Sequence, residues 1–173
     1  MDSHKWNKIR ITGGSGSGKT YLASRISLLT GIPLTSMDDL TYDFSQTHRF
    51  SHKRSIPERQ QLLAKVMSKN KWVLEGGYYS AVTHTYDSAD IIIFLHPSFI
   101  RRLFNTFKRF FKRLFSGKCE GFRNFLKLTR DNFSSRRKWQ VDRYIVFNKN
   151  YPSKCFTFKS ADDAFKWFKK EYL

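Results

Sequence analysis

The chain has 173 residues, with 32 Lys and Arg against 14 Asp and Glu and a formal net charge of +18. Hydrophobic residues make up 40% of it and aromatic residues 17%, which supplies enough apolar material for a packed core and excludes a disordered tail. Only 9 glycines and 4 prolines are present, which excludes collagen-like and low-complexity chains, and the longest apolar run (91–95) is too short to span a membrane.

Strand patterns and helix patterns alternate along the chain. The expected strands are residues 6–12, 32–37, 71–75, 90–95 and 154–158. The expected helices are residues 20–30, a helix that starts at the capping box Ser55–Glu58, residues 98–115, residues 122–147 with a break near 132–135, and a last helix capped by Ser160. Residues 39–54 are polar and aromatic and are predicted to be a loop. This alternation predicts an α/β fold with a parallel sheet and helices on both faces.

A glycine-rich segment separates the first strand from the first helix. The pattern G-x-x-x-x-G-K-[ST] is matched at every fixed position by Gly13, Gly14, Ser15, Gly16, Ser17, Gly18, Lys19 and Thr20. Glycines let backbone amides converge on phosphate oxygens, and the helix N-terminus behind them adds a partial positive charge. Lys19 would bridge the β- and γ-phosphates and the Thr20 hydroxyl would hold magnesium. The segment therefore predicts binding of ATP with Mg²⁺.

Two acidic residues follow predicted strands. In an open α/β sheet ligands bind outside the carboxyl ends of the strands, so Asp38 and Glu75 are both expected near the phosphates. Asp38 would take the proton of an acceptor hydroxyl or act on magnesium through water; the alternative is a turn or a helix cap. Glu75 would be a magnesium carboxylate, with Gly76 and Gly77 permitting close approach of a ligand; the alternative is a strand-end acid in a tight turn.

The segment from 101 to 138 is strongly basic, with 13 Lys and Arg against two acids. Three interpretations are compatible with one another. The first is an amphipathic helix that packs its apolar side on the sheet and leaves the cations in solvent. The second is a lid whose arginines neutralise the migrating phosphoryl group. The third is a surface for a polyanion, either nucleic acid or an acidic membrane. In the first of these the apolar side of the helix comprises Phe99, Leu103, Phe107, Phe110, Leu114 and Phe115.

The histidines and cysteines do not predict a metal site. His48 and His52 are four residues apart but have no further Cys or His nearby, and Cys119 and Cys155 lack metal-site spacing. Two cysteines do not make a disulfide framework, and the polar first residues do not form a secretion signal. We therefore expect ordinary free thiols and a cytoplasmic location.

Four segments in order resemble the small adenylate-kinase-like P-loop proteins known as the DNA-topology-modulation family. The segments are residues 13–20, 33–38, 72–78 and 89–97. The likeness covers nearly the whole chain, and its most discriminating part is the apolar strand that leads into acid-Gly-x-Tyr at 75–78. It implies a five-stranded parallel sheet of order 2-3-1-4-5, an arginine-bearing lid, and a phosphotransferase of the nucleoside or nucleotide kinase type.

The resemblance also implies roles for particular residues. Residues 13–20 would be the phosphate loop, Asp38 the acid that faces the acceptor, and Glu75 the acid after the third strand. The lid or phosphate arginines would be Arg102, Arg109, Arg130 and Arg136. The chain departs from the family at Glu75, where aspartate is usual, and at His96, where an acid is usual.

These observations predict one P-loop kinase domain with a core of residues 6–100 and 148–173 and a basic helical lid of about 101–147. The predicted activity is transfer of the ATP γ-phosphate to a small hydroxyl or phosphate acceptor, most simply a nucleoside or nucleotide. The alternative is a nucleotide-dependent protein whose partner is nucleic acid. Its motivation is the basic segment with interleaved phenylalanines, although no nucleic-acid-reading motif is present.

Overall fold

The structure, a computed structural model, describes residues 6–43, 52–77, 83–115, 147 and 149–173, without the side chains of residues 109, 110 and 112–115. Its centre is a five-stranded sheet with the strand order β2-β3-β1-β4-β5. Every neighbouring pair in this sheet is parallel. The sheet predicted from the alternation and from the family resemblance is therefore confirmed in both direction and order.

The strands are short and lie close to their predicted positions. They are β1 (Lys8–Gly13), β2 (Leu34–Ser36), β3 (Trp72–Glu75), β4 (Ile91–Leu95) and β5 (Cys155–Phe158). All residues of β3 and β4 are buried, as expected of inner strands that helices cover on both faces. The register places Ile11 beside Glu75 on one side and beside Ile93 on the other. The end of β1, where the glycine loop begins, therefore lies next to the end of β3.

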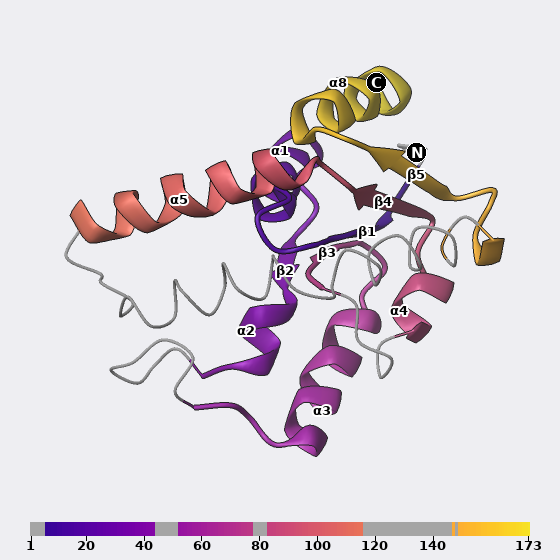
Figure 1. Ribbon diagram of the computed structural model, residues 1–173. Helices are drawn as coiled ribbons and strands as arrows, with labels where there is room; N and C mark the ends of the chain where they lie inside the picture. Colours follow the sequence, from indigo (N-terminus) through magenta and orange to yellow (C-terminus); the bar gives the residue numbers. More distant parts are fainter. Residues whose placement is uncertain (1–5, 44–51, 78–82, 116–146, 148) are drawn as a thin grey trace.

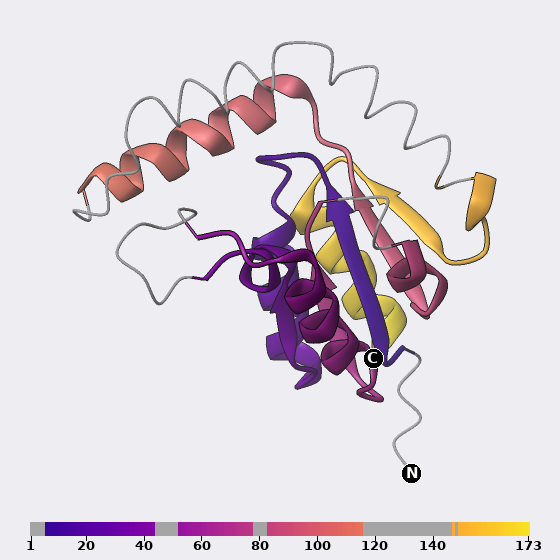
Figure 2. The same cartoon turned by 90° about the horizontal axis from the view of Figure 1, so that it is seen from below.

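Helices cover both faces of the sheet, as predicted (Figures 1 and 2). Helices α1 (Lys19–Thr30) and α8 (Ala161–Tyr172) pack on one face, where Leu22, Ile26 and Phe168 join the strand residues in one core cluster. Helices α3 (Ile56–Met67) and α4 (Thr83–Asp87) lie on the other face, where Leu63 and Tyr86 belong to a second cluster. Each face thus has an apolar core of its own.

Local capping explains where two of these helices begin. Ser160 Oγ accepts hydrogen bonds from the amides of Asp162 and Asp163, which fixes the start of α8 as predicted. Ser55 Oγ accepts from the amide of Glu58 at the start of α3, so the first half of the capping box is present. The Glu58 carboxylate forms an ion pair with Arg54 at 3.3 Å.

Part of the segment predicted as loop is helical. Helix α2 (Met37–Thr41) follows β2 directly, because the Ser36 side chain caps it by accepting from the Asp38 amide. Further on, Tyr42 pairs with Lys53 in an isolated antiparallel bridge. A helix of five residues is too short to show apolar periodicity in the sequence, which is why the prediction missed both α2 and the equally short α4.

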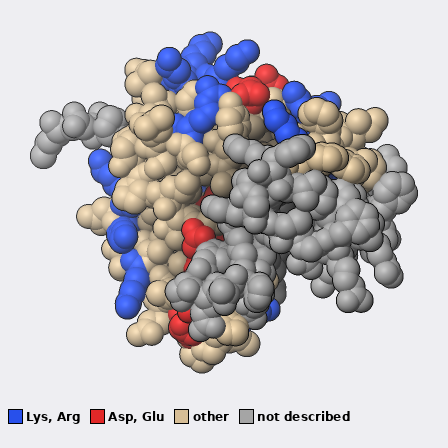
Figure 3. Space-filling model, turned by 90° about the vertical axis from the view of Figure 1, so that its left-hand side faces the viewer, with Lys and Arg blue, Asp and Glu red and all other residues tan. Residues whose placement is uncertain are grey.

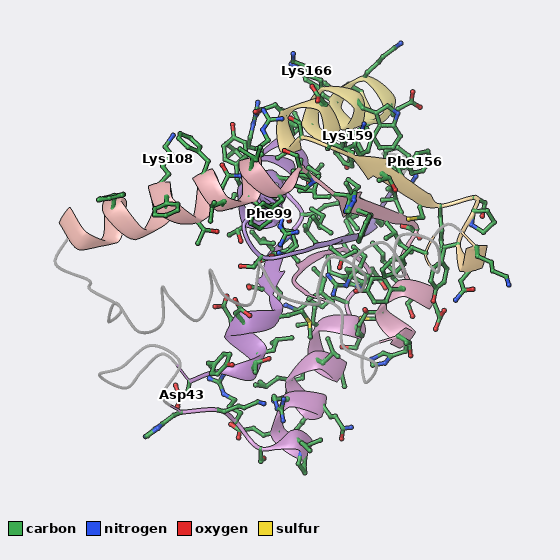
Figure 4. The ribbon with its side chains drawn as sticks, in the orientation of Figure 1. Asp43, Phe99, Lys108, Phe156, Lys159 and Lys166 are labelled. Carbon is green, nitrogen blue, oxygen red and sulfur yellow. The ribbon has the colours of Figure 1, made fainter. Side chains whose placement is uncertain are left out.

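Helix α5 (Phe99–Phe115) follows β4 and projects from the body of the molecule (Figure 1). Figure 4 shows Phe99 where the helix starts beside the sheet and Lys108 further along it. Among the described side chains of this helix, Arg102 and Thr106 are buried, Phe99 and Leu103 of the predicted apolar side are half-buried, and Phe107 is 38% exposed. The side chains of Phe110, Leu114 and Phe115 lie outside the described residues, so the packing of the apolar side on the sheet stays a prediction. The predicted helix at 122–147 lies outside the described residues, apart from Phe147.

Two further sequence predictions bear on the fold. Cys155 is buried, and its burial raises the pKa of the thiol to about 11, which makes it an unreactive core residue. Within the described ranges, no helix is both long enough and apolar enough to cross a bilayer.

Candidate functional site

The glycine loop connects β1 to α1 at the carboxyl end of the sheet. Ser17 is buried and its amide donates to the Gly14 carbonyl oxygen at 3.3 Å, which folds the loop back on itself. Lys19 Nζ donates to the same carbonyl oxygen at 2.8 Å, so the lysine side chain lies across the loop. Gly18 caps α1 and makes no side-chain hydrogen bond to its first turn, and the amides of a helix N-terminus are suited to an anionic ligand.

Helix α5 packs on the outer side of this loop. Arg102 Nε donates to the Ser15 carbonyl oxygen at 3.2 Å, and Asn105 Nδ2 donates to the Gly16 carbonyl oxygen at 2.9 Å. A Cβ on Gly16 would lie 2.6 Å from the Arg102 carbonyl oxygen and 2.8 Å from Thr106 Oγ1. Gly16 also has a φ of +72°, which side chains rarely adopt, so only glycine fits here. The helix thus binds the outward carbonyls of the loop.

Glu75 is the acid that the fold brings to the loop. It ends β3, is 4% exposed, and accepts hydrogen bonds from Thr20 Oγ1 at 3.2 Å and Ser36 Oγ at 2.8 Å. The three residues come from α1, β2 and β3, and they meet because the carboxyl ends of parallel strands lie at one edge of the sheet. The two residues predicted to share magnesium, Thr20 and Glu75, are therefore in direct contact.

This pair suits a magnesium ion in its chemistry. A carboxylate and a hydroxyl oxygen are hard donors, and magnesium commonly binds one or two protein oxygens together with substrate phosphates. Among the residues the structure describes, no group of three or more His, Cys, Asp or Glu side chains forms a metal cage. An ion at Thr20 and Glu75 would take its remaining ligands from water or from the phosphates of a nucleotide.

Asp38 is connected to Glu75 through the side chain of Ser36. It is exposed in the first turn of α2, and its amide donates to Ser36 Oγ at 3.2 Å. The Ser36 hydroxyl therefore contacts both the backbone of Asp38 and the carboxylate of Glu75. The sequence predicts for Asp38 either an acid that faces the acceptor or acts on magnesium through water, or a turn or helix-cap residue. Ser36 is the cap of α2 and Asp38 lies in its first turn, so the role of the Asp38 carboxylate stays a prediction.

The predicted arginines divide into two groups. Arg102 is 6% exposed and contacts the loop, and burial lowers the pKa of its guanidinium. The side chain of Arg109 and the whole of Arg130 and Arg136 lie outside the described residues. Of the four, the structure therefore places only the side chain of Arg102 at the glycine loop.

His96 follows β4 at the same edge of the sheet. Its ring stacks on Phe94, with centroids 6.0 Å apart, and its amide donates to the Phe158 carbonyl oxygen. Burial lowers the pKa of the imidazole, and the positive charges of Arg102 and Lys159 lower it further. The residue is thus a strand-end group whose surroundings favour the neutral imidazole.

Sequence reasoning passed over one residue at this site, Arg10 in β1. Its side chain is completely buried, and its guanidinium donates to the carbonyl oxygens of Gly76 and Gly77 in the turn after Glu75. A lone arginine in an alternating strand resembles a solvent-facing residue, so no pattern in the sequence indicates that it is buried. The burial of Arg10 depends on hydrogen-bond partners that lie 64 to 76 residues further along the chain.

The described basic side chains are not confined to the segment around α5. In Figure 3 Lys and Arg gather at the top of the face, at the height of α8, with acidic atoms beside them, and further Lys and Arg lie along the left-hand edge. Helix α8 contributes Lys166, Lys169 and Lys170, all of them exposed. On α5, Arg101 and Lys108 are exposed as well. The positive charge is therefore spread over more than one element.

Comparison with known proteins shows similarity in structure alone. No protein-family model matches the chain, and no curated protein matches it in sequence. Shikimate kinase from Acinetobacter baumannii in complex with shikimate superposes with a TM-score of 0.59 at 14% identity, covering 96% of this chain and 95% of that one.

Two other kinases superpose over similar lengths. Deoxyadenosine kinase from M. mycoides with bound dATP gives a TM-score of 0.52 at 13% identity, covering 95% of this chain and 97% of that one. A sugar kinase from Janibacter sp. HTCC2649 gives 0.52 at 13% identity, covering 95% and 92%. At such low identity these likenesses show the fold, which is the P-loop kinase fold.

Proposed function

We propose that this chain is an ATP- and magnesium-dependent phosphotransferase that transfers the γ-phosphoryl group to a hydroxyl or phosphate of a small molecule. The observation that carries the proposal is the contact of Glu75 with Thr20, directly behind a complete phosphate-loop sequence. The P-loop kinase fold, shared with kinases of three different acceptors, supports the reaction class. We infer a nucleoside or nucleotide acceptor from the resemblance to the DNA-topology-modulation family.

On the nucleotide side, residues 13–20 supply the phosphate contacts. The amides at the start of α1 and the Lys19 ammonium would bind phosphate oxygens, with Lys19 exchanging the Gly14 carbonyl for the phosphate. Thr20 and Glu75 would hold magnesium, which when bound would neutralise charge on the β- and γ-phosphates. Because Glu75 is buried and receives two hydroxyl hydrogen bonds, its carboxylate is oriented before any ligand arrives.

On the acceptor side, we assign Asp38 to the acceptor hydroxyl. Its amide is held by Ser36 just after the carboxyl end of β2, and ligands of open α/β sheets bind outside the carboxyl ends of the strands. A carboxylate there can orient the hydroxyl and take its proton as the new phosphate bond forms. The glycine turn after Glu75 would let the acceptor approach the backbone closely.

We further propose that residues 101–147 act as the lid, with Arg102 as the arginine nearest the phosphate loop. Its guanidinium contacts the Ser15 carbonyl oxygen, so α5 would have to move for this arginine to reach the phosphates. Arg109, Arg130 and Arg136 remain the predicted partners for the transferred charge. Neutralisation by such groups commonly contributes orders of magnitude to the rate of phosphoryl transfer.

The test is release of ADP from ATP in the presence of magnesium and a panel of nucleosides, nucleoside monophosphates, sugars and hydroxy acids. At least one acceptor should stimulate ADP release. The variant Lys19→Ala should reduce the stimulated rate by about 10²- to 10³-fold, as the loss of one preorganised charge contact does elsewhere. Lys166→Ala removes the same charge from an exposed position on α8 and serves as the control. No stimulation above the Lys19→Ala rate by any acceptor would refute the proposal.

The second candidate, a nucleotide-dependent nucleic-acid-binding protein, is motivated by the basic segment of residues 101–138. Phosphate contacts would make its DNA affinity fall steeply as the salt concentration rises. Titration of a duplex and of a single strand at two salt concentrations tests this. Absence of binding at low salt removes the candidate, whereas salt-sensitive binding without any acceptor-stimulated ADP release would favour it.

A further inference from the structure

Arg10 is an unusual residue for the middle of an inner strand. It lies in β1 between β3 and β4, and its side chain is 0% exposed. Removing a guanidinium from water is costly unless hydrogen bonds and charges compensate for the lost hydration. Burial accordingly lowers its pKa, while Tyr86 and Glu75 act in the opposite direction. An apolar side chain would satisfy this position more simply, so the contacts of the guanidinium need an explanation.

The guanidinium is held by partners from three parts of the chain. Nε donates to Thr85 Oγ1 at 3.3 Å, and Nη2 donates to Tyr86 Oη at 3.2 Å, both of them on α4. The guanidinium carbon also lies 4.7 Å from the centre of the Tyr86 ring. The remaining hydrogen bonds go to backbone carbonyl oxygens, those of Ile11 at 2.7 Å, Leu74 at 3.1 Å, Gly76 at 3.4 Å and Gly77 at 3.2 Å.

Three of these carbonyls flank Glu75. Leu74 precedes it and Gly76 and Gly77 follow it, so one side chain binds the backbone on both sides of the acid. β3 ends at Glu75, and the carbonyls beyond it have left the regular sheet ladder. After the end of β3, the guanidinium therefore supplies hydrogen bonds to the backbone in place of a neighbouring strand.

The same turn is confined from the other side. Gly76 has a φ of +150°, and a Cβ there would lie 2.5 Å from the Met37 Cβ. Met37 directly precedes Asp38, and Ser36, which caps that helix, donates to Glu75. The turn thus sits between Arg10 and the start of α2, so its conformation determines where the Glu75 carboxylate stands relative to Thr20.

We propose that Arg10 is a positioning residue for the Glu75 carboxylate, holding the 74–77 backbone so that the acid faces the Thr20 hydroxyl and the magnesium of the nucleotide. The proposal rests on the proposed function of this site. Arginine suits the task because its planar fork can reach several carbonyls at fixed angles, which a lysine ammonium cannot do. Residues that orient a metal ligand typically change metal affinity by about 10- to 100-fold when they are lost.

The experiment measures ATP binding by calorimetry, in excess magnesium and in excess EDTA, for the wild type, Arg10→Lys and Arg10→Met. In the wild type magnesium should tighten ATP binding. Both variants should lose about 10- to 100-fold in affinity with magnesium while binding as the wild type does in EDTA. A residue that only supported the fold would not separate these two affinities. Thermal unfolding at each condition confirms that the folded protein is being titrated.

Thr85→Val is the matched control. It removes another hydrogen bond of Arg10 in the same buried surroundings but leaves every donor to the turn in place. We expect it to lower the unfolding temperature and to keep the magnesium dependence of the wild type. Arg10→Met replaces a buried charge with an apolar side chain of similar length, an exchange that proteins often tolerate.

The outcomes separate this proposal from the proposed function. If magnesium does not affect ATP binding by the wild type, both are wrong. If it does, and the two Arg10 variants keep the same dependence, the role of Arg10 alone is overturned. Loss of cooperative unfolding in both variants would mean that Arg10 is needed for folding and not for positioning Glu75. That result would also overturn the proposed role of Arg10. An equal loss in Thr85→Val would have the same consequence.

Discussion

The glycine loop and helix α5 lie against each other, yet their sequences relate to their structures in opposite ways. In the loop, the motif residues lie together, with Lys19 across the loop and Thr20 beside Glu75. In α5, the helix is present as predicted but presents Arg102, Asn105 and Thr106 to the loop, while Phe104 is exposed. The periodicity of α5 predicts its conformation but not the direction it faces.

The difference follows from what determines each region. A phosphate loop is specified locally, since glycines at fixed spacing set the backbone and the next helix supplies the amides. The facing of a helix is decided by its neighbour. Here the neighbour is the glycine loop, which presents backbone carbonyl oxygens to α5. Side chains that donate hydrogen bonds are therefore favoured on the side of α5 that contacts the loop. The polar side of α5 is therefore its binding side, in contrast to the usual amphipathic helix on an apolar core.

The largest expected effect comes from crowding the contact between these regions. Gly16 and Gly31 have nearly the same φ, +72° and +70°, but a Cβ on Gly16 would meet Arg102 and Thr106, whereas nothing lies within 4 Å of one on Gly31. Gly31→Ala should lower the unfolding free energy by about 1 kcal/mol, the strain of the left-handed conformation alone. Gly16→Ala should lower it by about 2–3 kcal/mol, measured by chemical denaturation.

ATP affinity gives a second comparison of the two glycine variants. Gly16→Ala should also weaken ATP binding, because α5 or the loop has to move, and Gly31→Ala should leave that affinity unchanged. Equal destabilisation by the two substitutions would mean that α5 does not rest on the loop.

The fold was largely predictable because its signals are local. Apolar runs marked the inner strands, Ser160 marked the start of α8, and the glycine motif marked the junction of β1 and α1. Thr20 and Glu75, which the sequence predicts as magnesium ligands, are in contact, because the glycine loop after β1 and the end of β3 lie at the same edge of the sheet. Helix α2 escaped prediction because five residues show no period, and its cap, Ser36, also serves as the end of a strand.

What could not be predicted depends on distant partners. In the sequence, Arg10 is a single polar residue in a short strand. Its burial is possible because Tyr86 and the carbonyl oxygens after Glu75 accept its hydrogen bonds. The facing of α5 depends likewise on the carbonyls of Ser15 and Gly16. In both cases the decisive partner is a backbone oxygen, which every residue carries and which no sequence pattern marks.

A smaller effect distinguishes the two sides of α5. Asn105→Ala removes a hydrogen bond to the Gly16 carbonyl and should lower the unfolding free energy by about 1 kcal/mol. Phe104→Ala removes a larger apolar side chain that is 66% exposed and should change it by less than about 0.5 kcal/mol. Alanine raises helix propensity by a similar amount at both positions, so the difference reflects contacts. The reverse ranking, in a denaturant titration, would show that the packing of Phe104 contributes more than the contact of Asn105 with the loop.

The smallest effect is a pH dependence at the junction of the two regions. Burial lowers the pKa of His96 below its ordinary 6.5, and Arg102 of α5 together with Lys159 lowers it further. The unfolded chain therefore binds the proton more readily than the folded chain, and the stability contributed by the neutral ring is lost as the pH falls from 6.5 through the folded pKa. His96→Asn should abolish this part of the decline, seen as a shallower fall in unfolding free energy between neutral and mildly acidic pH. An identical pH profile in the variant would mean that the positive end of Arg102 does not reach the imidazole, and would place α5 farther from the strand end than its contacts with Ser15 and Gly16 require.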